Sequence, residues 1–145
     1  MTVVAAVDSG TGAKAVATAA ATLADQSDAP LHVLSIYEHS EHEHLINQAL
    51  DTGKSLSDED RATVATAAAE NAAADLTREY EPIGRRGKPA VEILEYATDV
   101  DAEYIVIGGR QRSRVGKALF GSVTQSVLLE ADCPVLVVPE EPKES

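Results

Sequence analysis

The chain has 145 residues, 44% of them hydrophobic, and this size and composition predict one globular domain over residues 1–145 with a single core. Its 24 acidic residues outnumber its 12 basic residues, and the net charge of −12 disfavours general binding to nucleic acid or to an anionic membrane. The single cysteine, Cys133, excludes an internal disulfide, and no apolar run approaches the ~20 residues that span a bilayer, so we expect a cytoplasmic protein.

The first half of the chain alternates short apolar runs with helical patterns. Residues 2–8 and residues 30–38 are apolar and rich in β-branched side chains, which predicts two buried strands. Residues 9–26, between them, repeat apolar side chains at helical spacing after a glycine turn, so we expect a helix. Residues 39–56 are polar without a clear period, and we expect a long loop that contains at most a short helical piece.

A long helix is predicted over residues 57–80. Ser57 precedes three acidic residues, whose carboxylates would face the positive end of the helix dipole. Apolar side chains then fall at every fourth position and predict one buried stripe: Val64, Ala68, Ala72, Leu76 and Tyr80. Residues 81–87 follow as a short third strand.

The rest of the chain repeats the alternation. Pro89 suits the first position of a helix. The inner face of that helix is predicted to carry Ile93, Leu94 and Ala97. A strand, a helix and a fifth strand are then predicted over residues 102–109, 121–132 and 135–139. The last helix presents Val123, Val127 and Leu128, and Pro134 ends the connection to the fifth strand.

This alternation predicts an α/β fold, a mainly parallel five-stranded sheet that is doubly wound, with helices on both faces. In such sheets ligands bind at the carboxyl ends of the strands, at the point where the strand order reverses. The loops to consider therefore follow Asp8, Glu38, Gly87 and Gly108.

The basic residues are concentrated in two of these loops. Seven of the twelve lie in two short segments: Arg85, Arg86, Lys88, Arg110, Arg112, Arg114 and Lys117. They form either two solvated loops or, where the fold brings them together, one anion site. The chain has only five lysines and an acidic tail over residues 140–145, a composition that also suits a protein soluble in high salt, as in a halophile.

Two glycine-containing segments are near matches to phosphate-binding motifs. Residues 10–15, GTGAKA, follow a strand and begin a helix, which fits a dinucleotide-binding pattern with Glu38 as its acidic partner. The same residues suit an ordinary flexible helix start, and Asp8 before the glycines would repel a pyrophosphate. Residues 114–118, RVGKA, do not form a P-loop, because Gln111 and Ala118 replace the glycine and the hydroxyl residue that this motif needs.

The segment EHSEHEH contains three candidate metal ligands: His39, His42 and His44. Their spacing matches no defined metal site, and a histidine-rich tract is only a compositional argument. We therefore predict a solvated loop without a resident metal, with a metal site as the alternative; such a loop would still bind nickel or zinc loosely in vitro.

Residues 105–128, IVIGGRQRSRVGKALFGSVTQSVL, have the features of an anion-binding loop. Gly108 and Gly109 end the fourth strand, and Gly121-Ser122 lies at the start of the next helix. Backbone N–H groups at a helix N-terminus bind anions, and glycine lets a phosphate approach closely. The Ser122 hydroxyl can donate to a phosphate oxygen, and the arginines between could close over the charge. The alternative is a plain helix cap beside surface arginines.

Four segments carry a resemblance that covers essentially the whole chain. They are VVAAVD, GKPAVEILEYA, AEYIVIGG and GKALFGSVTQSVLLEADCPVLVVP. Together they resemble the universal stress protein family. The resemblance implies a flavodoxin-like, Rossmann-like α/β fold, similar to that of the adenine nucleotide alpha hydrolases, in agreement with the alternation above. It also implies a homodimer joined along the apolar edge of the last strand: Val135, Leu136, Val137 and Val138.

The resemblance further implies a cofactor, ATP or another adenine nucleotide, with or without Mg²⁺. Family members that bind it resemble G-x2-G-x9-G-[S/T] after the fourth strand; Gly108 and Gly121-Ser122 match, whereas Gln111 replaces the second glycine. Asp8 would approach the adenine or ribose. The predicted nucleotide-binding residues are Val7, Asp8, Ser9, Leu34, Ile107, Gly108, Gly109, Arg110, Gln111, Arg112, Gly121, Ser122 and Val123.

Gln111 bears on whether the chain binds a nucleotide. If position 111 needs a left-handed conformation, glutamine costs about 1–2 kcal/mol, or roughly tenfold in affinity, although its amide can donate to phosphate.

We predict a stress-response protein whose nucleotide occupancy biases the conformation of the loop of residues 108–121 and, through it, a surface that contacts a partner. The alternatives are a nucleotide-free dimeric interaction module and a slow nucleotide hydrolase. Asp8, Ser9 and Ser122 could flank a phosphate, but no residue is predicted to be catalytic, because no activated water or committed base is marked.

Overall fold

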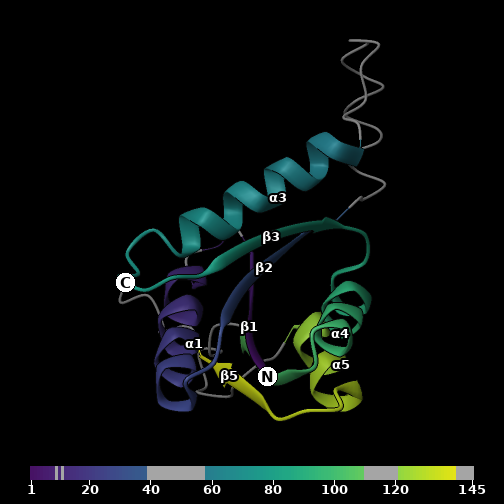
Figure 1. Ribbon diagram of the computed structural model, residues 1–145. Coiled ribbons are helices and arrows are strands. Elements are labelled where there is room, and N and C mark those ends of the chain that lie inside the picture. The colour runs from purple at the N-terminus through teal and green to yellow at the C-terminus, as the bar shows by residue number, and fades with distance from the viewer. Residues whose placement is uncertain (9, 11, 39–57, 110–120, 140–145) are drawn as a thin grey trace, which may run out of the picture.

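The computed structural model describes residues 1–8, 10, 12–38, 58–109 and 121–139. Five strands form one sheet: β1 (Thr2–Val7), β2 (Leu31–Tyr37), β3 (Glu81–Arg86), β4 (Ala102–Gly108) and β5 (Val135–Val138). All their pairings are parallel, in the order β3-β2-β1-β4-β5 (Figure 1). The predicted five-stranded parallel α/β fold is therefore confirmed.

Helices cover both faces of this sheet: α1 (Ala13–Ser27), α3 (Asp58–Ala72), α4 (Pro89–Asp99) and α5 (Ser122–Glu130). In Figure 1, α1 lies on one side of the strands and α4 and α5 lie on the other, while α3 runs over β3 and β2. This is the doubly wound arrangement that right-handed crossovers produce. No helix in the described parts of the chain is long and apolar enough to cross a membrane.

The core has two layers, one on each face of β1. All six residues of β1 are buried, and their side chains alternate between the layers. Val3, Ala5 and Val7 pack with α1 and the end of α3, whereas Val4 and Ala6 pack with α4 and α5. Such burial on both faces explains why β1 has no polar alternation in its sequence.

The helix predicted over residues 57–80 differs from the structure in its end and in its buried face. α3 ends at Ala72, and Val64 on the predicted stripe is 49% exposed. Ala72 of the predicted stripe is buried, and the other buried positions here are Arg61, Ala65, Ala69 and Ala73. Residues 61, 65, 69 and 73 repeat at the same spacing of four, so the buried face is displaced from the predicted stripe by one residue, a rotation of about 100°.

A close contact with β3 fixes which face of α3 is buried. A Cβ atom at Gly84 would collide with the Ala62 carbonyl oxygen and with Thr66. Glycine on the strand and alanines on the helix therefore let the two backbones approach. β3 is an edge strand, which also explains how it accommodates Pro82.

Candidate functional site

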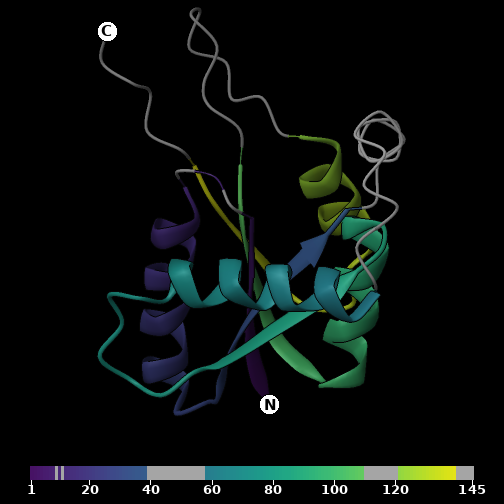
Figure 2. The same ribbon diagram turned by 90° about the horizontal axis from the view of Figure 1, so that it is seen from above.

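The strand order reverses between β1 and β4. These strands are neighbours, with Ala6 opposite Ile107, but the chain leaves β1 for α1 on one face and β4 for α5 on the other. Figure 2 shows the strands running from the N label toward the opposite side of the molecule, where β4 ends and α5 begins. A ligand site is expected at this carboxyl edge.

Asp8 lies at the end of β1 and is exposed. Its Oδ1 accepts a hydrogen bond of 2.8 Å from the Gly10 backbone N–H. A Cβ at Gly10 would lie 2.9 Å from that same oxygen, so glycine is needed for this turn to close without a shift. The bond orients the carboxylate through Oδ1, and the other oxygen, Oδ2, can accept a hydrogen bond from a ligand.

The N-terminus of α5 is the second part of the site. Gly121 is the N-cap residue and, having no side chain, makes no side-chain capping bond. The Gln125 N–H donates to the Gly121 carbonyl as the first intrahelical bond, at 3.0 Å. The N–H groups of Ser122 and Val123 therefore have no partner within the helix and can donate to an anion.

Thr124 joins these two parts. Its hydroxyl donates to the Gly108 carbonyl oxygen at 2.8 Å, and its side chain is 5% exposed. The first turn of α5 is thereby attached to the end of β4. Sequence analysis did not single out Thr124. Its position three residues before the buried Val127 places it on the inner face of the helix. A buried hydroxyl needs a hydrogen-bond partner, so this position could have indicated a contact with the sheet.

The apolar residues predicted for the site divide between the two core layers. Val7 packs on the α1 side, and Leu34 and Ile107 pack on the side of α4 and α5. Leu34 is opposite Ala6, two residues before Asp8, and is fully buried beneath the carboxyl edge. Ile36 is two residues further along the same face of β2 and is partly buried, so it lies nearer the edge.

The glycine at the end of β4 faces α1. A Cβ at Gly108 would lie 3.3 Å from Val16 Cγ2, so even alanine would require a small shift of α1. The Gly109 N–H donates to the Val138 carbonyl at 2.9 Å and continues the pairing with β5. Four of the predicted site residues lie outside the described residues: Ser9, Arg110, Gln111 and Arg112.

The structure describes only one of the two basic segments, the one that contains Arg85, Arg86 and Lys88. Arg85 and Arg86 end the edge strand β3, and Arg85 lies over the Tyr96 ring at 4.8 Å from its centroid. β2 and β1 separate that strand from β4, about 14 Å at the usual strand spacing. Arg114 and Lys117 lie outside the described residues, so a joint anion site stays a prediction.

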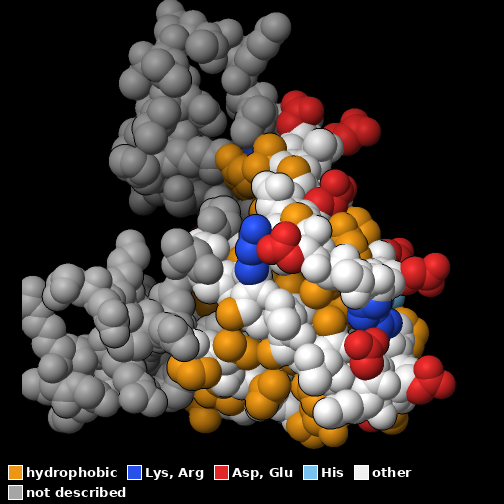
Figure 3. Space-filling model, turned by 90° about the vertical axis from the view of Figure 1, so that its left-hand side faces the viewer, with side chains coloured by type: hydrophobic (Ala, Val, Ile, Leu, Met, Phe, Trp, Pro, Cys, Tyr) orange, Lys and Arg blue, Asp and Glu red, His pale blue; other side chains and the backbone are white. Residues whose placement is uncertain are grey.

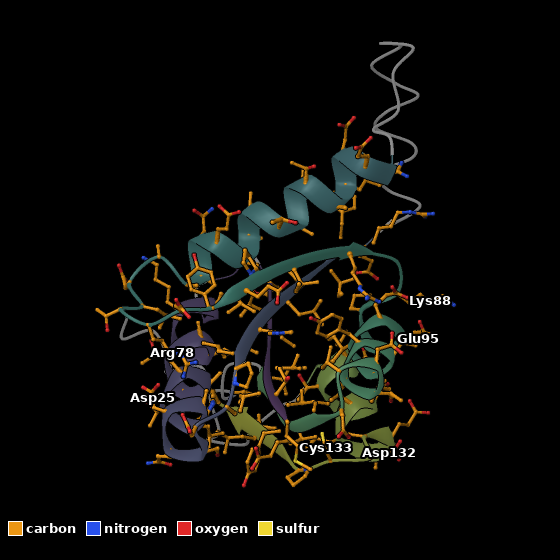
Figure 4. All side chains as sticks on the ribbon, viewed as in Figure 1. Asp25, Arg78, Lys88, Glu95, Asp132 and Cys133 are labelled. Carbon is orange, nitrogen blue, oxygen red and sulfur yellow. The ribbon has the colours of Figure 1, made fainter. Side chains whose placement is uncertain are left out.

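Two clefts lie at the opposite, amino edge of the sheet and do not include the predicted site. One, about 530 Å³, lies between the ends of α4 and α5 and is lined by Cys133 and several carboxylates, among them Glu95 and Asp132 (Figure 4). The other, about 760 Å³, lies beside the starts of β2 and β3 and includes Arg78, whose guanidinium pairs with Asp25 at 2.6 Å. The candidate site thus consists of strand ends and a helix start.

The histidine-rich loop of residues 39–44 also lies outside the described residues. Within the described ranges, no three His, Cys, Asp or Glu side chains are grouped closely enough to hold a metal ion.

Comparison with known proteins identifies relatives along the chain. The sequence model of the universal stress protein family matches residues 1–139. The structure of a universal stress protein from Archaeoglobus fulgidus is 28% identical, with a TM-score of 0.61 over 94% of this chain and 97% of that chain. The structure of the universal stress protein from Archaeoglobus fulgidus in complex with dAMP is 26% identical, with a TM-score of 0.54 over 94% of this chain and 96% of that chain.

Curated relatives match over shorter segments. The stress response protein NhaX of Bacillus subtilis is 42% identical over 52 residues, 36% of this chain and 31% of that protein. The universal stress protein MJ0531 of Methanocaldococcus jannaschii is 43% identical over 58 residues, 40% of this chain and 34% of that protein. The chain therefore spans about a third of the length of these curated relatives.

Proposed function

The chain belongs to the universal stress protein family, and we propose that it is a stress-response protein that binds an adenine nucleotide at the carboxyl ends of β1 and β4. The observation that carries this proposal is the start of α5. Its free backbone N–H groups are held beside the end of β4 by the Thr124–Gly108 hydrogen bond, at the reversal of the strand order. A relative of 26% identity that binds dAMP supports the same ligand class.

In this proposal the phosphates lie at the N-terminus of α5. The N–H groups of Ser122 and Val123 and the Ser122 hydroxyl donate to phosphate oxygens, with Gly108, Gly109 and Gly121 leaving room for the approach. Arg110, Gln111 and Arg112 would add donors, and Ser9 would lie beside the first strand. Mg²⁺, where present, would offset the phosphate charge.

The nucleoside lies at the end of β1 in this proposal. Asp8 Oδ1 is occupied by Gly10, so Oδ2 accepts from a sugar hydroxyl or from the adenine amino group. Ile107, with Leu34 in the same core layer, gives the base an apolar contact on the side of α4 and α5, and Ile36 is a further candidate at that edge. Val7 lies beside the base at the end of β1, on the α1 side.

Calorimetry with AMP, dAMP and ATP, with and without Mg²⁺, tests the proposal. We expect binding of one nucleotide per chain. Ser122→Ala should weaken it by roughly threefold to tenfold, since it removes one phosphate hydrogen bond. Ser126→Ala, one turn further along α5, is the matched control and should leave affinity unchanged. Absence of binding at millimolar nucleotide would exclude this function.

A nucleotide-free interaction module is the second candidate. It is favoured by Gln111, which interrupts the glycine motif of the nucleotide-binding relatives. Gln111→Gly distinguishes the two: nucleotide affinity about tenfold higher in the variant means that glutamine weakens an existing site. If neither form binds nucleotide, the interaction module is the better description.

A further inference from the structure

A chain of polar contacts links α4 to the edge of the sheet, away from the nucleotide site. His32 Nδ1 lies 2.5 Å from the Tyr96 hydroxyl oxygen, and His32 Nε2 lies 3.2 Å from Glu81 Oε2. The His32 and Tyr96 rings are 5.9 Å apart between centroids, and the Arg85 guanidinium covers the other part of the Tyr96 ring. Tyr96 is 5% exposed and packs in the core layer on the α4 side, whereas its hydrogen bond with His32 is partly buried and Glu81 is largely exposed.

The register of the sheet explains this arrangement. His32 is opposite Glu81 and Ile36 is opposite Arg85, so all four side chains belong to the same face of the β2–β3 pair. Tyr96 comes from α4, which packs on that face, and its ring spans from His32 to Arg85. One aromatic side chain therefore connects the helix with both strands.

When His32 is neutral, the contacts define which of its ring nitrogens carries the proton. Glu81 is a carboxylate and can only accept, so His32 Nε2 carries a proton and donates to it. In neutral histidine Nδ1 is then an acceptor, and the Tyr96 O–H donates to it. Burial, and next the negative charge of Glu81, raise the pKa of Tyr96 against a lowering by Arg85, so the phenol keeps its proton and can donate.

We propose that the His32–Tyr96 hydrogen bond is a proton-sensitive contact between α4 and the β2–β3 pair. Neutral His32 accepts from the phenol. When His32 takes up a proton, Nδ1 becomes a donor, the bond reverses, and the phenolic hydrogen loses its acceptor at a partly buried position. Acidification therefore weakens the attachment of α4 to this edge of the sheet.

The charged groups around His32 do not compensate for the acceptor that the phenolic hydrogen loses. Glu81 and Arg85 face it from β3, and Tyr96 faces it from α4; its neighbour on β1 is the uncharged Val4. Glu81 attracts imidazolium, but its side chain is 63% exposed, so water screens that attraction. The cleft beside His32 adds three charged groups, Asp28, Arg78 and Glu79.

A thermodynamic cycle at two pH values tests this proposal. The unfolding constants of the wild type, His32→Ala, Tyr96→Phe and the double variant give the coupling between the two side chains. Nuclear magnetic resonance of the imidazole nitrogens fixes the pH values at which His32 is neutral and protonated. We expect a coupling of roughly threefold to tenfold in the unfolding constant when His32 is neutral, and under about twofold when it is protonated.

Two controls keep the test decisive. Tyr104→Phe removes a phenol from β4, and its effect on the unfolding constant should not change with pH over the same range. The wild-type imidazole spectrum needs no variant and should show a protonated Nε2 and an unprotonated Nδ1 when His32 is neutral. A proton on Nδ1 in that state, or a coupling that is equal at the two pH values, would overturn the proposal.

Discussion

Single side chains position the candidate site. Thr124 is a polar residue on the inner face of α5, and its hydroxyl is used entirely within the protein, on the Gly108 carbonyl. One carboxylate oxygen of Asp8 likewise accepts a hydrogen bond from the Gly10 backbone N–H. These bonds fix the end of β4 relative to the start of α5, and the end of β1 relative to the turn before α1.

Thr124→Val is expected to destabilise the protein by about 1 kcal/mol, because valine keeps the shape and removes the donor to Gly108. It should also lower nucleotide affinity, because the N-terminus of α5 is no longer attached to β4. Urea unfolding and calorimetry measure the two effects. Thr98→Val is the matched control: Thr98 is exposed and donates to the Leu94 carbonyl within α4, and its replacement should cost under about 0.5 kcal/mol. Equal losses in the two variants would contradict a special role for Thr124.

Cys133 is expected to react slowly with iodoacetamide at neutral pH. Burial raises the pKa of the thiol; a hydrogen bond with the Ile105 backbone lowers it and the charge of Asp132 raises it further. The reactive thiolate is therefore scarce near pH 7, and the rate should keep rising as pH increases past the usual thiol range. Asp132→Asn should increase the rate at pH 8. Mass spectrometry measures it without ambiguity, since the chain has one cysteine; a rate already constant above pH 7 would be the contrary result.

At the scale of helices and strands, β-branched runs and glycine or proline boundaries predict all five strands to within two residues. The buried face of α3 could not be predicted in this way. Alanine occurs on every side of that helix, so hydrophobicity hardly distinguishes its faces. The face is decided by Gly84 on a strand that follows in the sequence, and periodicity within the helix contains no information about that partner.

Gly84→Ala tests this contact. The added methyl group meets the Ala62 carbonyl and Thr66, so we expect a loss of about 1–3 kcal/mol of unfolding free energy as α3 moves from the sheet. Thr66→Ala in the same chain should not restore stability, because the backbone atoms of residues 62 and 66 remain in the way. Denaturant midpoints give both values, and an unchanged midpoint for Gly84→Ala would show that α3 is not held at this distance.

The candidate site could be predicted in part for a similar reason. Asp8, Gly108 and Ser122 are found from the ends of predicted elements, because parallel strands bring their carboxyl ends to one edge. Thr124 and Ile36 were missed, since their roles depend on a hydrogen bond across elements and on the register of β2. The part that Gln111 plays stays a prediction from sequence.

At the scale of the whole molecule, β5 is an edge strand whose only partner in the described sheet is β4. Leu136 on this strand is 41% exposed. Figure 3 views the α1 side of the molecule and shows hydrophobic side chains along its lower edge. This edge is at the same height as β5 in Figure 1. An apolar edge of this kind is suited to pairing with a second copy. We therefore propose a homodimer through Val135, Leu136, Val137 and Val138.

Leu136→Glu is expected to convert that dimer to a monomer, because Leu136 is 41% exposed on the edge strand and the two added carboxylates would repel each other across the paired edges. Light scattering after size-exclusion chromatography should give a mass about twice the 15.2 kDa of the chain for the wild type and a single chain mass for the variant. Val91→Glu, an exposed valine on α4, is the control and should leave the mass unchanged. A monomeric wild type would exclude this interface.

The central strand β1 is synthesised long before one of its two neighbours. Val3 pairs with Leu31, whereas Thr2 on the other edge lies opposite Ala102 in β4, about 100 residues later. At ~5–20 residues per second, roughly 5–20 s separate the synthesis of these partners. During that time one edge of a strand that is buried in the finished fold has nothing to pair with. We expect that edge of β1 to stay open to pairing with other strands until β4 emerges.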